Sequence, residues 1–301
     1  MDNFRIPLGD WVADGLNWFK ATFDGFLDVV TMVIKFLVEG LADGLTAMPF
    51  AALIIVFGLI GWVLRSWQLA VGTVITMLLI VAMGQWENAM LTLALVLIAA
   101  LIAIIIAIPL GIAAARSDAF SAILKPILDF MQTMPAFVYL IPAVIFFSIG
   151  FVPGVFATVL FSVAPGVRFT ELGIRGVDSE TVEAGYAFGA APGKILRGIQ
   201  LPLAMPTIMA GINQVIMLAL SMAVVAGMAG ANGLGKEVVA AISTLDIAQG
   251  VEAGLSVVIL AVFLDRVTAA LGNPGEFKHS LLGALRRRRD SRRTGDLAKA
   301  A

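Results

Sequence analysis

Two segments rich in glycine and lysine have the residue types that bind phosphate in proteins. Residues 230–236 show the spacing Gly-x4-Gly-Lys of a nucleotide-binding loop, in which backbone N–H groups surround the phosphates. Glu237 stands where Ser or Thr must ligate magnesium, however, and no predicted strand precedes the segment. Residues 189–194 are one residue too short for the same motif. We therefore predict that any ATP is bound by another chain.

Nucleophiles and metal ligands are scarce. The 301-residue sequence has no cysteine, which excludes a thiolate nucleophile, a disulfide and a cysteine-ligated metal. Its single histidine, His279, lies in a basic C-terminal segment, so a cluster of histidine ligands is also excluded. We predict no catalytic residue, no metal site and no cofactor in this chain.

Composition indicates an all-helical, polytopic membrane protein. The chain is 60% hydrophobic and only 14% charged, and its mean hydropathy is +0.98. Most of the long apolar segments contain no Asp, Glu, Lys or Arg, which argues against a proton-driven carrier, because such carriers place ionisable residues within the membrane. We predict seven spans, over residues 49–64, 67–84, 88–115, 134–150, 152–167, 207–229 and 251–271.

The first 48 residues are amphipathic rather than uniformly apolar. Seven polar residues between Lys20 and Asp43 fall within an arc of about 140° on a helix, and apolar residues occupy much of the rest. Five charges between Asp24 and Asp43 would make spanning costly. We expect this segment to lie along the extracytoplasmic surface of the membrane, with Trp11 and Trp18 at headgroup level. A first transmembrane helix is the alternative.

The distribution of basic residues predicts the orientation. If the polar loop defined below is cytoplasmic, 16 of the 20 Lys and Arg residues lie on the cytoplasmic side. The positive-inside rule then places the N-terminus outside and the C-terminus in the cytoplasm. Residues 278–301 form a basic tail, which we expect to hold the topology and touch anionic lipid rather than nucleic acid. Anionic-lipid sensing, or contact with the chain that binds ATP, is an alternative role for this tail. We predict that residues 49–277 form the membrane domain, which contains the polar loop.

One charged stretch interrupts the apolar sequence, and we call residues 171–206 the polar loop. We predict two short helices in it. Asp178 or Ser179 is suited to cap the first helix, over residues 180–188, and Gly189 to end it in the left-handed conformation.

Proline marks the limits of the second predicted helix. Pro192 suits the first turn, because its missing N–H would have no partner there. The helix is expected to end near Gln200, since Pro202 restrains the residue before it, and the next span to begin after Pro206.

Residues at fixed spacing in the polar loop resemble the EAA motif of ABC-importer permease subunits, EAA-x3-G-x9-I-x-L-P. They are Glu183, Ala184, Gly185, Gly189, Ile199, Leu201 and Pro202. The one departure is Gly185, which replaces alanine and weakens helix propensity by up to about 1 kcal/mol. An ordinary amphipathic loop is the alternative.

This resemblance implies a type I ABC-importer permease fold in which the polar loop docks as a coupling helix in a cleft of a separate ATPase. Glu183 would face a basic residue of that ATPase, and Gly189 would make the turn. Ile199, Leu201 and Pro202 would anchor the second helix to the membrane bundle.

Further segments are similar to permeases for glycine betaine, proline and choline. They are residues 128–142, with Pro135 and Pro142 expected to bend the fourth span, and residues 150–154, 201–211 and 264–268. The resemblance implies a bacterial inner-membrane importer built from a homodimer of this chain, two ATPase subunits that bind ATP and magnesium, and a soluble extracytoplasmic binding protein. Importers for an amino acid or sulfonate, and an autonomous secondary carrier, are the alternatives.

Three polar or adaptable residues recur at helical spacing in the sixth predicted span. They are Asn213, Met217 and Ser221. They are candidates to line a translocation path for the substrate. Hydrogen bonding between helices is an equally good interpretation, because small and polar residues commonly provide it in membrane bundles.

Overall fold

The computed structural model describes residues 6–272, and within this range it is helical and contains no strand. The predicted basic tail and His279 lie outside the described residues. The larger helices are α1 (Leu8–Thr22), α2 (Asp24–Ala47), α3 (Phe50–Leu64), α4 (Trp67–Ala82), α5 (Trp86–Arg116), α6 (Asp118–Thr133), α7 (Leu140–Phe147), α8 (Phe151–Arg175), α9 (Ser179–Ala187), α11 (Leu201–Ala226), α12 (Leu234–Thr244) and α13 (Ile247–Gly272). Shorter helical turns are η1 (Ala136–Tyr139), α10 (Pro192–Ile195), η2 (Leu196–Gln200) and η3 (Gly227–Ala229).

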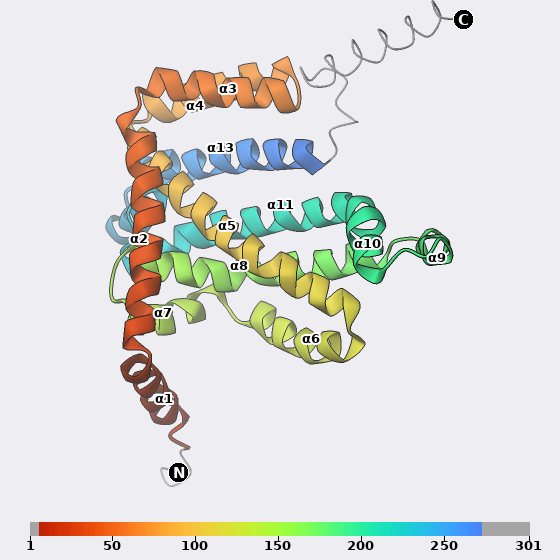
Figure 1. Cartoon of the computed structure of the whole chain (residues 1–301). Coiled ribbons are helices and arrows are strands. Elements are labelled where there is room, and N and C mark those ends of the chain that lie inside the picture. Colours follow the sequence, from red (N-terminus) through yellow and green to blue (C-terminus); the bar gives the residue numbers. More distant parts are fainter. Residues whose placement is uncertain (1–5, 273–301) are drawn as a thin grey trace, which may run out of the picture.

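Helix α8 lies at the centre of the bundle, packed against α5 and α11, and α13 lies beside α11 (Figure 1). Small residues bring these helices together: Ala99, Ala103 and Ala107 of α5 are fully buried. The buried hydroxyls of Thr158, Ser162 and Thr170 on α8 donate to carbonyls four residues earlier, as Ser162 does to Thr158 at 2.7 Å, so each of the three has a partner.

Six of the seven predicted spans each fall on one continuous helix, and the fourth falls on η1 and α7. The all-helical prediction is therefore confirmed for the described residues. By length and composition, the described residues contain four helices able to cross a membrane: α5, α8, α13 and the continuous helix Pro192–Ala229. Two further pairs of helices are sharply bent, and if each pair counts as one span the number rises to six at most. Helix α4 is apolar, but its 16 residues make it shorter than these four helices.

The predicted fourth span, residues 134–150, is broken. Only α7 is α-helical there, and its eight residues extend about 12 Å, too little to cross an apolar core alone. Helix α6 and residues 136–147 meet at an angle of 107°, with Pro135 at the break. Pro142 lies within the continuous helical segment 136–147, and the sharp bend lies at Pro135, contrary to the prediction that Pro142 also bends the span.

The N-terminal segment forms two helices, α1 and α2, rather than one. One face of α2 is buried against α5 by Leu27, Ile34, Val38 and Ala42. The acidic residues are exposed along the flank beside this face. Helix α2 crosses one end of the bundle and meets α3 at 107° (Figure 1). Lys20 ties α1 to α7 by donating to the carbonyl of Ile145 at 2.7 Å.

Candidate functional site

Helix α9 stands apart from the bundle, at the end opposite α2 (Figure 1). Asp178 begins the helix, because its carboxylate accepts from the backbone N–H of Glu180 at 3.3 Å and from the hydroxyl of Thr181 at 3.1 Å. The predicted N-cap is therefore confirmed, with Asp178 in the role.

The turn after α9 depends on Gly189, which has a φ of +74°. The N–H of Gly189 donates to Tyr186 O at 2.8 Å, and the N–H of Ala190 donates to Gly185 O at 3.1 Å. These two bonds are the Schellman pattern, which closes a helix C-terminus with a left-handed residue. The predicted glycine turn is confirmed.

The second helix of the polar loop does not end near Gln200, so this prediction was wrong. Pro192 opens α10 as expected, but the helix then runs without a break to Ala229. Residues 196–200 form a π-helical turn, in which the N–H of Leu201 donates to Leu196 O. This wider register changes the hydrogen-bond pairing just before Pro202, so a residue that lacks an N–H can follow it.

The first half of the loop also begins later than predicted. Helix α8 continues through Glu171 to Arg175, so the first residues of the polar loop belong to the bundle. The charges at this end of α8 are compatible with a helix because they pair with one another and with α6, as described below.

The residues of the EAA-like motif have different environments. Glu183 and Ala184 are exposed on α9, whereas Gly185 is buried against Ile195 and Ile199. A Cβ on Gly185 would lie 2.7 Å from Ile199 Cδ1, so glycine allows α9 to approach the following helical segment closely.

The three residues expected to anchor the second helix also differ. Ile199, half-buried, contacts α9, and Leu201, half-buried, packs against the cluster around Ile174 and Ile208. Pro202 is exposed. Leu201 thus has the contact with the bundle that was expected of all three, while Ile199 fixes α9 to the helix behind it.

Two aromatic side chains near the end of α9 were not among the predicted site residues. Tyr186 is 52% exposed and Phe188 is 91% exposed. Large exposed aromatic residues mark surfaces that bind other proteins. Their position in the four residues before Gly189 was the signal that sequence reasoning could have used.

A buried carboxylate network also escaped prediction, and it joins α8 to α6. Glu171 is 7% exposed and accepts from the hydroxyl of Ser121 at 2.6 Å. Arg175 Nε lies 3.0 Å from the same carboxylate, and Lys125 Nζ lies 3.8 Å from it. The network fixes the last turn of α8, from which the chain passes to α9.

Exposed ion pairs extend this network. Arg175 donates to Asp118 at 2.7 Å and to the carbonyl of Ala114, at the end of α5, at 2.8 Å. Arg168 pairs with Asp129 one turn further along α6. Three helices are therefore held together by charges at the end of the bundle that carries α9.

The candidate translocation residues do not form one polar stripe. Asn213 donates to Asp265 of α13 at 3.0 Å and accepts from the hydroxyl of Thr268. Ser221 bonds the carbonyl of Met217 in its own helix at 3.0 Å. For Asn213 the geometry favours hydrogen bonding between helices.

The glycines that resembled a nucleotide-binding loop serve packing. The N–H of Leu234 donates to Thr92 Oγ1 at 2.8 Å, and Gly233 lies against the same residue with a φ of +125°. Gly235 lies against the backbone of α11. Within residues 6–272, no three His, Cys, Asp or Glu residues gather as metal ligands.

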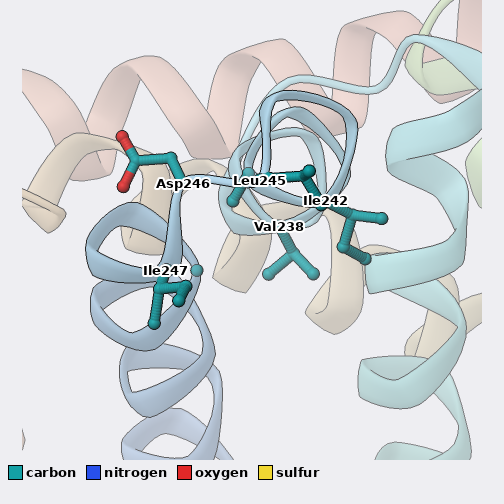
Figure 2. Close-up of a pocket in the computed structure, with 7 residues that line it drawn as sticks. Val238, Ile242, Leu245, Asp246 and Ile247 are labelled. Carbon is teal, nitrogen blue, oxygen red and sulfur yellow. The ribbon is translucent and has the colours of Figure 1, made fainter.

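A cavity of about 600 Å³ lies at the turn between α12 and α13 (Figure 2). Its lining is apolar apart from Asp246, and Leu245 and Ile247 are 86% and 81% exposed. It offers an apolar surface and little polar chemistry.

Comparisons with known proteins identify the chain's relatives. The family model described as binding-protein-dependent transport system inner membrane component matches residues 107–272. The chain is 46% identical over 267 residues to the glycine betaine/proline betaine transport system permease protein ProW of Escherichia coli (strain K12), covering 89% of this chain and 75% of that protein. It is 47% identical over 264 residues to the glycine betaine transport system permease protein OpuAB of Bacillus subtilis (strain 168), covering 88% and 94%.

Solved structures support the fold. An inward-facing structure of the MetNI methionine ABC transporter matches with a TM-score of 0.56 at 18% identity, covering 61% of this chain and 92% of that chain. At this identity the likeness concerns the arrangement of helices alone.

Proposed function

Because the chain belongs to the family of binding-protein-dependent transport system inner membrane components, we propose that it is the membrane-spanning subunit of an ATP-driven importer for quaternary-ammonium compounds. Glycine betaine and proline betaine are the first candidates, since relatives with nearly half of their residues identical over most of this chain bear those names. ATP hydrolysis is assigned to a separate ATPase chain.

The observation that carries this proposal is the exposed helix α9. It presents Glu183 together with Tyr186 and Phe188, none of which is buried in the bundle. Behind it, Gly185 packs on Ile195 and Ile199, so movement of α9 is passed to the continuous helix Pro192–Ala229. In the proposed mechanism, ATP-driven closure of the ATPase subunits moves α9 and switches the bundle between inward-open and outward-open states.

The proposed assembly contains two copies of this chain, two ATPase subunits and a soluble binding protein. The ATPases would bind at the end that carries α9, and the binding protein at the opposite end. The exposed apolar turn of Leu245 and Ile247 supports a protein contact at that opposite end, because exposed apolar patches mark interaction surfaces.

The proposed orientation has α9 in the cytoplasm and α2 along the extracytoplasmic membrane surface. The position of α2 across one end of the bundle supports this (Figure 1), as do its single buried face and its exposed acidic residues. Asn213 is proposed as a helix-to-helix contact, and Met217 and Ser221 as residues of the translocation path.

Reconstitution tests the proposal directly. The full chain, its ATPase and its binding protein are placed in liposomes, and ATP hydrolysis and uptake are measured with betaine, choline, proline and carnitine in turn. We expect uptake of a quaternary amine that requires all three components. Stimulation by an amino acid or sulfonate alone would identify a different cargo, and uptake without any ATPase would overturn the proposal in favour of an autonomous carrier.

Replacing Glu183 with alanine should weaken the association of the chain with its ATPase by about 30-fold, because truncating one partner of a partly buried charge pair costs about 2 kcal/mol. Co-purification with the ATPase and ATP-driven uptake both measure the effect. Glu180→Ala, which removes an exposed carboxylate from the first turn of the same helix, is the matched control and should retain uptake. Normal coupling in Glu183→Ala would contradict the role.

Replacing Gly189 with valine should uncouple ATP hydrolysis from uptake. The left-handed conformation costs a residue with a Cβ about 1–2 kcal/mol, and more when that residue is β-branched. A Cβ at this position would meet no atom within 4 Å beyond the adjacent residues, so the backbone conformation decides the result. Gly193→Val, at an open position whose φ is not left-handed, is the control, and Gly189→Asn should restore part of the coupling.

A further inference from the structure

A basic pocket lies between the end of α5 and the helical segment after α9. It has a volume of about 730 Å³, and its charged lining residues are Arg116, Lys194 and Arg197. The other lining residues are Ala191, Gly193, Leu196 and Gly198, so no carboxylate is found among the described residues that line the pocket. We call this site the basic pocket.

The three cations are unpaired, unlike their neighbours. Within residues 6–272, Arg116, Lys194 and Arg197 make no ion pair and no side-chain hydrogen bond. At the same end of the bundle, Lys125, Arg168 and Arg175 each pair with a carboxylate of α6 or α8. Three like charges that share a cavity repel one another, so an anion bound among them relieves a repulsion that the protein alone leaves uncompensated.

The position of Arg116 on α5 shows where the pocket lies relative to the exposed apolar surface of that helix. Ile105, Pro109 and Ala113 are exposed on α5, and with Arg116 they fall within an arc of about 80° on one side of the helix. The exposed apolar stripe therefore ends at Arg116 itself. On the facing helix, Leu203 is 55% exposed six residues beyond Arg197. The pocket thus begins where the exposed apolar surface stops, at the level of lipid headgroups.

From these observations we propose that the basic pocket binds the phosphodiester headgroup of an anionic membrane phospholipid. Arginine and lysine are the residues that recognise phosphate oxygens, and basic pockets between membrane helices bind anionic headgroups. The acyl chains would follow the stripe of Ile105, Pro109 and Ala113. The site would place a lipid against the helix that begins at Pro192, directly behind α9.

A titration of the full-length chain with phosphatidylglycerol, followed by native mass spectrometry, tests the proposal, with phosphatidylcholine as the zwitterionic lipid. We expect one phosphatidylglycerol to bind more tightly than the others. Its affinity should fall about fivefold in Arg116→Ala and tenfold or more in the triple variant Arg116→Ala, Lys194→Ala and Arg197→Ala. Lys236→Ala, whose side chain contacts Asn232 outside the pocket, removes one cation elsewhere and should change nothing.

Two results would overturn the proposal. If inorganic phosphate displaces phosphatidylglycerol at low millimolar concentration, the pocket is a site for a free anion. If both variants retain their affinity for phosphatidylglycerol but lose association with the ATPase, the cations serve the protein partner. Arg116→Ala lies outside the polar loop, so its lipid affinity remains informative even if the triple variant does not fold.

Discussion

Replacing Glu171 with alanine is expected to lower the free energy of unfolding by about 2–4 kcal/mol and to reduce ATP-driven uptake more strongly than it reduces the amount of folded protein. The substitution leaves the hydroxyl of Ser121, which is 3% exposed, without its acceptor. A buried donor without a partner costs about 1–3 kcal/mol, and a hydrogen bond to a charged group contributes about 1.5–3 kcal/mol. Denaturation by SDS in mixed micelles measures the stability change.

Glu171 should have a large effect on stability because it is buried, and Asp118 provides an exposed control. Glu171 and Asp118 both contact the guanidinium of Arg175, but the side chain of Asp118 is 92% exposed. Asp118→Ala should therefore lower the free energy of unfolding by less than about 1 kcal/mol. Glu171→Gln keeps an acceptor for Ser121 and should fall between the two. Equal losses in all three variants would show that the network does not depend on the buried carboxylate.

Uptake should fall further than stability because of where Glu171 lies. It anchors the last turn of α8, and α9 begins four residues after Arg175. If α9 transmits movement from the ATPases, its attachment to the bundle must be stiff. Loss of the Glu171 contacts loosens that attachment even in molecules that remain folded.

Local signals in the sequence were sufficient to predict helix α9 and its closing turn, although not the start of the polar loop. Asp178 is a capping residue before a run of helix formers, and Gly189 is a residue that adopts the left-handed conformation at low cost. Both act within a few residues of the atoms that they bond. The helix α9 and its closing turn could therefore be predicted from the sequence.

Contacts between distant residues could not be predicted in the same way. Glu171 and Ser121 are 50 residues apart, and nothing in either local sequence indicates that they meet. The prediction that the second helix ends near Gln200 was wrong for a related reason. The proline rule assumes α-helical bonding, whereas the π-helical turn at residues 196–200 changes that bonding just before the proline.

The spacing of Asn213, Met217 and Ser221 left two interpretations open, because helical spacing identifies a face but not what covers it. Asp265 and Thr268 of α13 cover the face at Asn213. Asp265 is 52 residues from Asn213 in the sequence, and only the packing of α11 on α13 brings the two together.

Replacing Gly227 with alanine is expected to prevent the segment between α11 and α12 from folding. A Cβ at this position would lie 2.3 Å from the carbonyl carbon of Gly235 and 2.5 Å from the backbone N of Lys236. Both are backbone atoms, so no side-chain rotation relieves the overlap. The cost should reach or exceed the upper end of the roughly 1–3 kcal/mol typical of overpacked cores.

Gly254→Ala provides the matched control for this substitution, because a Cβ there would meet no atom within 4 Å. Alanine in the interior of α13 should leave stability unchanged or raise it by up to about 1 kcal/mol. The monodisperse fraction that survives heating in detergent, followed by size-exclusion chromatography, distinguishes the two variants. A Gly227→Ala protein as stable as the parent would mean that α12 can move away from α11, and the close approach of Gly227 and Gly235 would then not be what fixes this segment.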